Sequence, residues 1–265
     1  MSRTSRRAWP ALLAPVALAA AVAVFGQGAE RDGARASSAR PRAERVTVTV
    51  DLGRRLSGTR SVVGLLHGLR ATAPASRWID PLRPALWRGN LFSAPFTRVT
   101  RSGARYMLVV SDLWGYPGER WRGRGPPWAD LEGWRTFVRG LAESAPAGDI
   151  VWDVWNEPDN PYFWAGTREQ YLTTFEIAAE AIRRVLGPSA EIAGPSVSAF
   201  RWDWLRALVD HCLAARCQVN VVTWHELPSG STSIASIGDH LRSARPRILA
   251  SPELAPVGAG EIVIN

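Results

Sequence analysis

The sequence contains no lysine, so all 32 basic residues are arginines, which stand against 24 acidic residues for a formal net charge of +8. A surface that binds phosphate usually gathers lysine and arginine into clusters. These arginines instead occur singly or in pairs among alanine, glycine and proline. The positive charge therefore does not indicate nucleic-acid binding, and we expect no nucleic-acid partner.

Nucleotide-binding motifs and metal-binding clusters are also scarce. No Gly-x-Gly-x-x-Gly follows the first predicted strand and no phosphate-loop pattern occurs, which removes the main support for a dinucleotide-binding fold. The chain has only two cysteines, Cys212 and Cys217, with His211 beside them. Because a zinc site needs a second pair of ligands, we expect neither a metal ion nor a cofactor.

Apolar residues make up 46% and charged residues 21% of the 265 positions, which allows a sizeable core and excludes a wholly disordered chain. The length suits one large domain or two modest ones. Tryptophan is abundant, with 13 residues against 4 tyrosines and 7 phenylalanines. Since a buried indole N–H needs a partner, this surplus has two explanations: packing in the core, or flat faces that stack on sugar rings or cationic groups.

The N-terminal residues have the layout of a bacterial secretory signal. Three arginines within residues 1–7 precede an apolar run over 10–25, and small residues follow it. This run is shorter than the roughly 20 residues that a membrane-spanning helix needs. We predict a signal peptide over 1–36, a linker over 37–45, and a protein that is secreted or kept at the cell envelope. An uncleaved N-terminal anchor is the alternative.

Export also bears on the two cysteines. In an oxidising compartment Cys212 and Cys217, which lie close together in the sequence, are expected to form a local disulfide. The alternative is a pair of reduced thiols at a helix end.

From residue 46 onward, strand-like and helix-like segments alternate. Most strand candidates are continuous apolar runs, as expected for parallel strands covered on both faces. The clearest helix begins with the capping box Thr167-Arg168-Glu169-Gln170 and ends at Gly187-Pro188. These repeats predict a parallel α/β sheet, and the favoured architecture over 46–265 is a (β/α)8 TIM barrel with about seven of its eight strands. The strand candidates are 62–66, 85–88, 105–110, 150–155, 191–193, 219–224 and 261–264, and another strand over 46–52 precedes the barrel.

Polar residues follow the ends of these strands, where a TIM barrel carries its catalytic groups. One polar residue at a strand end is usually a solvated loop residue, whereas five such ends interleaved with tryptophan indicate a functional site. The five ends carry His67, Arg88, Asp112 with Trp114, Asn156 with Glu157, and His225 with Glu226.

The segment Trp155-Asn156-Glu157-Pro158 resembles the acid/base motif of clan A retaining glycoside hydrolases, in which Asn-Glu closes the fourth barrel strand. The wider stretch 151–167 resembles family 39. The resemblance continues through Ala193-Gly194-Pro195-Ser196 and Val222-Thr223-Trp224-His225. It implies a TIM barrel that acts on a carbohydrate substrate, in a family of β-xylosidases, α-L-iduronidases and bacterial exopolysaccharide hydrolases.

The resemblance also implies roles for single residues. It makes Glu157 the general acid and later the general base of a double displacement, and it directs Asn156 at the sugar 2-hydroxyl. Arg88 would lie beneath the nucleophile, and His225 would hold sugar hydroxyls or support the nucleophile. The remaining candidates for substrate contacts are His67, Trp114 and Trp155.

The resemblance breaks at the seventh strand, where clan A enzymes carry a nucleophilic glutamate. The sequence ends with Asn265 directly after this strand, and Glu226, Glu253 and Glu261 are not placed to substitute. We expect a fragment that is inactive by itself, with the nucleophilic glutamate following Asn265. The alternatives are a secreted sugar-binding barrel that does not hydrolyse its ligand, and an envelope structural protein.

Overall fold

A computed structural model of the chain describes residues 63–89, 94–111, 126–227 and 234–265. The predicted signal peptide (1–36), linker (37–45) and early strand (46–52), together with Trp114, lie outside the described residues. Within the described ranges, no helix is long and apolar enough to cross a membrane.

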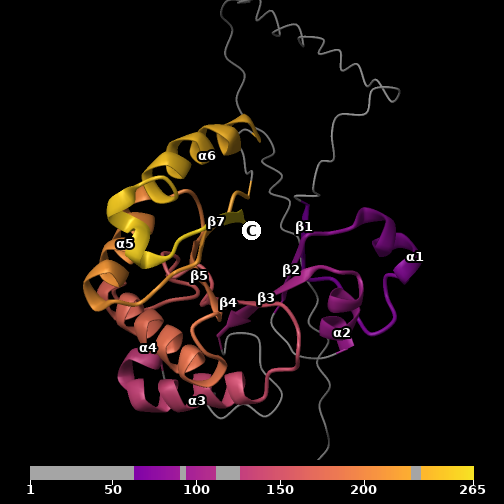
Figure 1. The fold of residues 1–265 in the computed structure, drawn as a ribbon, viewed down its shortest axis with the longest axis horizontal. Helices are drawn as coiled ribbons and strands as arrows, with labels where there is room; N and C mark the ends of the chain where they lie inside the picture. The colour runs from indigo at the N-terminus through magenta and orange to yellow at the C-terminus, as the bar shows by residue number, and fades with distance from the viewer. Residues whose placement is uncertain (1–62, 90–93, 112–125, 228–233) are drawn as a thin grey trace, which may run out of the picture. The chain divides into compact units, whose positions relative to one another are not determined.

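Seven parallel strands form one sheet in the order of the sequence. The sheet curves around a central space with helices on its outer side, which confirms the predicted incomplete (β/α)8 barrel (Figure 1). Six of the strands overlap closely with the predicted segments, and the fifth extends further than predicted. The strands are β1 (Gly64–Leu66), β2 (Leu86–Gly89), β3 (Arg105–Val110), β4 (Ile150–Val154), β5 (Glu191–Val197), β6 (Val221–Trp224) and β7 (Glu261–Ile264).

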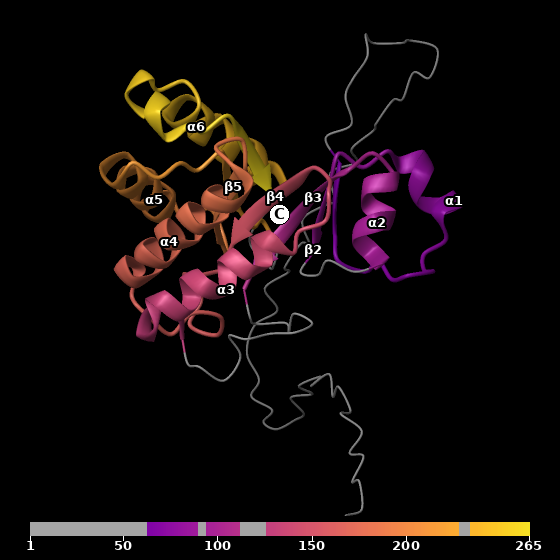
Figure 2. The same cartoon turned by 60° about the horizontal axis from the view of Figure 1, so that its bottom comes forward.

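The helices follow the strands and run back along the sheet (Figure 2). The longest begins as the sequence predicts, because the Thr167 hydroxyl accepts a hydrogen bond from the Gln170 N–H and the Gln170 side chain accepts one from the Thr167 N–H. The α-helices are α1 (Ser76–Ile79), α2 (Ala94–Arg101), α3 (Leu131–Glu143), α4 (Arg168–Leu186), α5 (Trp202–Ala215) and α6 (Ile234–Ile248).

The main hydrophobic core lies between the sheet and the helices. Seven tryptophans are buried in it, so packing accounts for most of the tryptophan that the structure describes. The indole of Trp134 on α3, for example, is fully buried and donates to the Thr174 carbonyl oxygen on α4 at 3.0 Å. The seven are Trp87, Trp134, Trp152, Trp155, Trp164, Trp204 and Trp224.

The inner side of the sheet carries three layers of side chains, because alternate residues of each strand point inward. At the amino ends of the strands, Arg105 on β3 forms ion pairs with Glu191 on β5 and Glu261 on β7. The middle layer is apolar and is built by Met107, Val151, Ala193 and Val221, against which Leu86 and Val263 pack. The third layer, at the carboxyl ends, is polar and forms the floor of the site.

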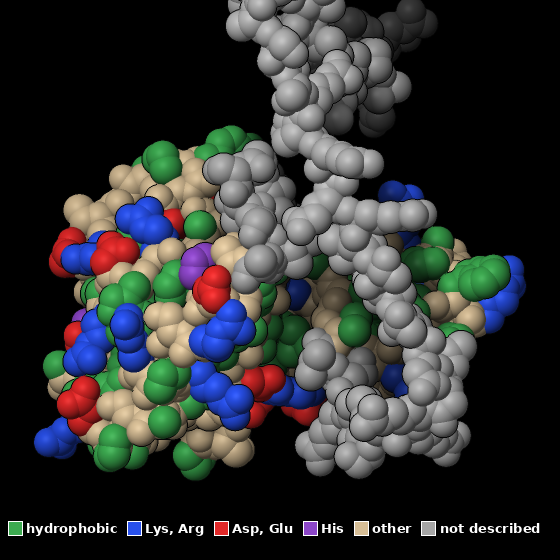
Figure 3. Space-filling view, turned by 90° about the horizontal axis from the view of Figure 1, so that it is seen from above, with side chains coloured by type: hydrophobic (Ala, Val, Ile, Leu, Met, Phe, Trp, Pro, Cys, Tyr) green, Lys and Arg blue, Asp and Glu red, His purple; other side chains and the backbone are tan. Residues whose placement is uncertain are grey.

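Acidic and arginine side chains are interspersed over the face of the molecule shown in Figure 3. Arg135 on α3 is likewise in a mixed group, since it pairs with Glu132 on its own helix and with Glu180 on α4. This mixture differs from the single-sign surface that phosphate binding favours.

Candidate active site

Glu157 lies in the turn that follows β4. Trp155 and Glu157 have φ angles of +75° and +47°, a left-handed conformation that is uncommon for residues other than glycine and concentrates at functional sites. The Glu157 N–H donates to the Ser196 carbonyl oxygen at 2.9 Å, which ties the turn to β5. This turn directs consecutive side chains to different sides of the sheet.

Trp155 points outward from this turn. Its indole is 3% exposed, lies edge-on to Trp134 and Trp164, and donates to the Phe163 carbonyl oxygen at 3.0 Å. The expected sugar contact by Trp155 is therefore corrected: this side chain packs between the sheet and the helices. The left-handed backbone at Trp155 explains the difference, since it interrupts the alternation that would have directed the ring inward.

Arg88 and Asp153 form a buried ion pair in the floor of the site. An Nη2–Oδ2 distance of 2.6 Å joins side chains that are 3% and 0% exposed. The guanidinium also donates from both terminal nitrogens to Oδ1 of Asn156, at 3.2 Å each. Because Oδ1 accepts these bonds, Asn156 has its Nδ2 hydrogens to offer to a ligand.

Ser196 connects four strands at the same level. Its hydroxyl donates to Oδ1 of Asp153 at 2.6 Å, lies 2.7 Å from the Thr223 hydroxyl, and accepts from Nδ2 of Asn265 at 3.0 Å. All of these groups point into the barrel from β4, β5, β6 and the end of β7. Ser196, Thr223 and Asn265 are not among the site residues predicted from the sequence. The signal that could have found them is their inward register at the carboxyl ends of neighbouring strands.

His225, directly after β6, contacts the carboxyl group of Glu157. Its Nδ1 lies 2.8 Å from Oε1, and Nδ2 of Asn160 donates to Oε2 at 2.9 Å. Glu157 and His225 are 8% and 6% exposed. Burial, and then the positive charge of Arg88, lower the pKa of His225, while Glu157 and Asp153 partly oppose the shift. The histidine is therefore neutral near pH 7.

Two of the buried polar atoms in this region have no hydrogen-bond partner among the described residues: Nε2 of His225 and Oδ1 of Asn265. A cavity of about 700 Å³ adjoins the floor between β1–β2 and β7. Arg88 and Asn265 line its polar end, and Leu86 and Val263 line its apolar part. Its volume falls in the range of roughly 300–1,000 Å³ that is typical of small-molecule sites.

His67 follows β1 and has a left-handed backbone with a φ of +51°. Its carbonyl oxygen accepts from the Trp87 indole at 3.0 Å. The side chain retains some exposure to solvent, yet partial burial and then the charge of Arg88 lower its pKa. His67 thus lies within the electrostatic reach of the site.

Comparisons with known proteins show which family and fold this chain resembles. Residues 146–246 match the profile of glycosyl hydrolases family 39. The beta-xylosidase of Caldicellulosiruptor saccharolyticus is 26% identical over 117 residues, which are 41% of this chain and 23% of that protein. Residues 146–246 of this chain therefore resemble family 39.

Solved structures support the fold of this family 39-like chain. A glucosidase from Croceicoccus marinus superposes with a TM-score of 0.59 at 13% identity, over 78% of this chain and 51% of that chain. A family 39 β-xylosidase from Caulobacter crescentus gives a TM-score of 0.58 at 15% identity, over 77% of this chain and 52% of that chain. The chain thus spans about half the length of these structures and about a quarter of the curated relative.

The family 39-like region contains Asn156, Glu157 and His225, whereas Arg88 and β7 lie outside the matched residues. The structure nevertheless brings Arg88 to Asn156 and Asn265 to Ser196. The site is therefore assembled by the fold from both sides of the matched segment.

The other carboxylates that the sequence analysis considered have partners away from Glu157. The side chain of Glu226 is 4% exposed; it accepts from the Trp224 indole at 2.9 Å and lies 2.5 Å from Nδ1 of His240. Glu261 pairs with Arg105 at the amino ends of the strands, and Glu253 lies 3.6 Å from Arg206. Among the described residues, no group of three or more His, Cys, Asp or Glu side chains is arranged to hold a metal ion.

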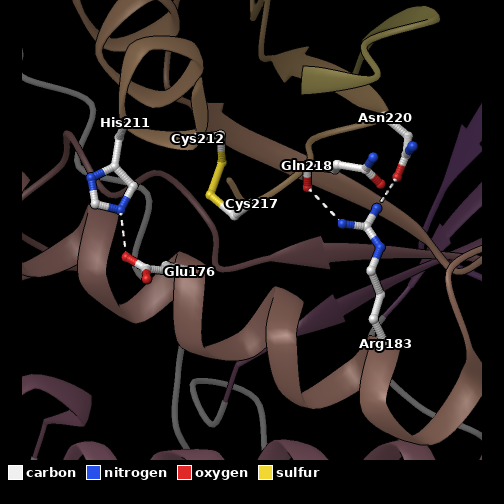
Figure 4. The surroundings of a disulfide bond; sticks show 7 residues. All are labelled: Glu176, Arg183, His211, Cys212, Cys217, Gln218 and Asn220. Carbon is white, nitrogen blue, oxygen red and sulfur yellow. Dashed lines mark hydrogen bonds and ion pairs between the residues drawn. A yellow bond between two sulfur atoms is a disulfide. The ribbon is translucent and has the colours of Figure 1, made fainter. Parts of the chain in front are cut away.

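Cys212 and Cys217 form a disulfide in the structure, at the C-terminal end of α5 (Figure 4). Because α5 ends before β6 begins, this disulfide lies towards the amino ends of the strands, opposite Glu157. His211 pairs with Glu176 beside it, and Arg183 bonds to the Gln218 carbonyl oxygen and to Oδ1 of Asn220. The cysteines therefore belong to the packing of the outer helices.

Proposed function

We propose that this family 39-like chain is part of a secreted retaining glycoside hydrolase in which Glu157 is the general acid and base. The observation that carries the proposal is a buried glutamate at the carboxyl end of β4 whose two carboxyl oxygens are held by His225 and Asn160. Asn156 lies beside it in the sequence and is oriented by Arg88. In a barrel, this is the end at which catalysis takes place.

The proposed reaction cleaves a glycosidic bond by double displacement. Glu157 gives a proton to the leaving oxygen while a second carboxylate, roughly 5 Å away, attacks C1 and forms a covalent glycosyl-enzyme. Glu157, now ionised, then takes a proton from the water that hydrolyses this intermediate. The Nδ2 hydrogens of Asn156 would bind the sugar 2-hydroxyl, an interaction that strengthens toward the transition state.

We propose that the second carboxylate belongs to a glutamate that follows Asn265. Trp224 pairs with Ile264 in the register of β6 and β7, and the Asn265 N–H donates to the Trp224 carbonyl oxygen at 3.0 Å. In this register Asn265 stands level with His225, which contacts Glu157, and a residue after Asn265 would stand one position further along, level with Glu226. This position at the barrel mouth is the one a nucleophile needs.

The proposed substrate is an oligosaccharide or a polysaccharide. Two proteins that this chain resembles are named as a beta-xylosidase and a glucosidase, and both names describe glycosidases. Secretion is proposed from the signal-like layout of residues 1–36.

Glu157→Gln in the full-length enzyme tests the acid role. Turnover of substrates with poor leaving groups should fall by about 10²–10⁴-fold, because they need protonation. Activated aryl glycosides should lose much less in the glycosylation step. Equal losses on both substrate types would remove Glu157 from the acid role.

Glu226→Gln is the matched control for this experiment. Glu226 also has a buried side chain near a strand end, but its partners are Trp224 and His240. The control should show no dependence on the leaving group. Sugar binding without turnover by the unaltered full-length protein would contradict the hydrolase proposal and favour a binding protein.

A further inference from the structure

We propose that His225 is a positioning residue whose tautomer follows the charge of Glu157, so that its Nε2 is a hydrogen-bond donor when Glu157 is protonated and an acceptor when Glu157 is ionised. The proposal rests on the proposed function, since it concerns the acid/base residue of that reaction. Of the two roles expected for His225, it retains the contact with a sugar hydroxyl, and it replaces the support of the nucleophile by a contact with the acid/base residue.

The hydrogen bonds around Glu157 determine where its proton can reside. Nδ2 of Asn160 donates to Oε2 at 2.9 Å, and Oδ1 of the same amide accepts from the Tyr162 N–H at 3.0 Å. This second bond fixes the orientation of the amide, so Asn160 can only donate to Glu157. A proton on the carboxyl group is therefore favoured on Oε1, which faces Nδ1 of His225 at 2.8 Å.

Each state of the pair has one consistent arrangement of protons. When Glu157 is protonated, Oε1–H donates to the lone pair of Nδ1, and the neutral imidazole carries its hydrogen on Nε2. When Glu157 is ionised, Nδ1–H donates to Oε1, and Nε2 has a lone pair. When the pair ionises in solution, Oε1 gives one proton to Nδ1, and Nε2 releases one proton to solvent. The pair then changes its charge from zero to −1. This equilibrium is separate from turnover, in which the Glu157 proton goes to the leaving oxygen and the ring then exchanges its Nε2 proton for one on Nδ1.

The surroundings of His225 favour the neutral imidazole, which is the direction that the proposal needs. The charged groups that face it among the described residues are Arg88 from β2, Asp153 from β4 and Glu157 after β4. Burial and the guanidinium of Arg88 lower the histidine pKa more than the two carboxylates raise it. A doubly protonated ring would donate from Nδ1 in both states, and its tautomer could not report the charge of Glu157.

The partner at Nε2 must be able to donate and to accept. Nε2 is buried in a side chain that is 6% exposed, and it has no hydrogen-bond partner among the described residues. A buried polar atom without a partner is costly, so a ligand that reaches it gains binding energy. A sugar hydroxyl matches both states of the ring, because it can rotate to donate or to accept. We therefore assign Nε2 to a substrate hydroxyl whose hydrogen-bond direction reverses with the charge of Glu157.

Nitrogen NMR of the full-length protein, labelled with ¹⁵N-histidine, tests the coupling without any turnover. In a pH titration, the hydrogen of the His225 ring should move from Nε2 to Nδ1 as Glu157 ionises. The His225 signals are identified as those that disappear in His225→Gln. In Glu157→Gln the amide oxygen should accept from Asn160 and the amide NH₂ should donate to Nδ1. This variant should therefore hold the ring as the Nε2–H tautomer at every pH at which the ring is neutral.

Glu226→Gln serves as the control, because Glu226 contacts Nδ1 of His240; it should change the signals of His240 and leave those of His225 unaltered. A His225 tautomer that ignores Glu157→Gln, or an imidazolium throughout the titration, would overturn the proposal. The result is separable from the leaving-group test. If the His225 tautomer responds to Glu157→Gln while turnover of both substrate types falls equally, the acid role of Glu157 is rejected and the coupling of the two side chains is retained.

Discussion

The ion pair between Arg88 and Asp153 allows the floor of the site to be tested without a substrate. Arg88→Met leaves the carboxylate of Asp153, which is 0% exposed, with the Ser196 hydroxyl at 2.6 Å as its remaining described hydrogen-bond partner. Removing one member of a buried pair costs about 3–5 kcal/mol, because the other charge remains buried without compensation. In a folded unit of this size, we expect Tm to fall by roughly 6–20 °C.

The double variant Arg88→Met/Asp153→Asn removes both charges, so the interaction free energy of the pair can be distinguished from its interactions with other residues. It should be more stable than the sum of the two single losses predicts, with an interaction free energy of about 0.5–3 kcal/mol. Urea unfolding followed by tryptophan fluorescence measures all three variants, and equal m values would show that the unfolded states are comparable.

Arg206 and Asp210 on α5 provide a matched surface pair. Their nitrogen–oxygen distance is 2.7 Å, close to that of the buried pair, but their side chains are 41% and 47% exposed. Breaking this pair with Asp210→Asn should cost no more than about 0.5 kcal/mol. Equal costs for the two pairs, or additive losses at Arg88 and Asp153, would refute the reasoning from burial.

Three further predictions use the same unfolding assay. Burial and the charge of Arg88 lower the pKa of both His225 and His67, so the folded state binds fewer protons below the ordinary value of 6.5. The contribution of the two histidines to the free energy of unfolding should be constant above pH 6.5 and should fall as the pH drops through the lowered pKa values. A contribution that grows on acidification would be inconsistent with these pKa shifts. Gly194→Ala should destabilise the fold by about 1–3 kcal/mol through overpacking, since a Cβ there would lie 2.7 Å from the Phe175 ring. A Cβ at Gly140 on α3 meets nothing within 4 Å, so Gly140→Ala should stabilise by about 0.5–1 kcal/mol. Changes of the same sign in the two free energies of unfolding would reject the packing argument. Thr167→Ala removes the capping box of α4 and should cost about 1 kcal/mol, and no loss would show that tertiary packing alone holds this helix end.

The strands and helices were predictable because their hydrophobic patterns are strong. The runs at β3 and β7 match the observed strands residue for residue, and the capping box correctly places the start of α4. β5 is longer than predicted because Gly194 and Pro195 resemble a strand end. In the structure the strand continues to Val197, with a register shift between Pro195 and Val197 that accommodates the proline.

The site residues were predictable only where the chain itself marks the end of a strand. Asn156, Glu157 and His225 follow apolar runs, and the structure brings them together. The direction of each side chain was harder to predict, because a left-handed residue such as Trp155 changes this direction and no glycine marks the turn in the sequence. Hydrogen-bond partners such as Ser196 depend on the register of four strands, which no single segment of sequence encodes.

The position of Ser196 explains how the fold holds Glu157, the proposed acid, through hydrogen bonds to neighbouring strands. Its carbonyl oxygen accepts from the Glu157 N–H, while its hydroxyl contacts Asp153 and Asn265. Through Asp153 the same network reaches Arg88 and so the amide that lies next to Glu157. The end of β7 and the turn that carries Glu157 are therefore linked by hydrogen bonds through one buried serine. A change at the end of β7 should disturb Asn156 and Glu157 even though it touches neither residue directly.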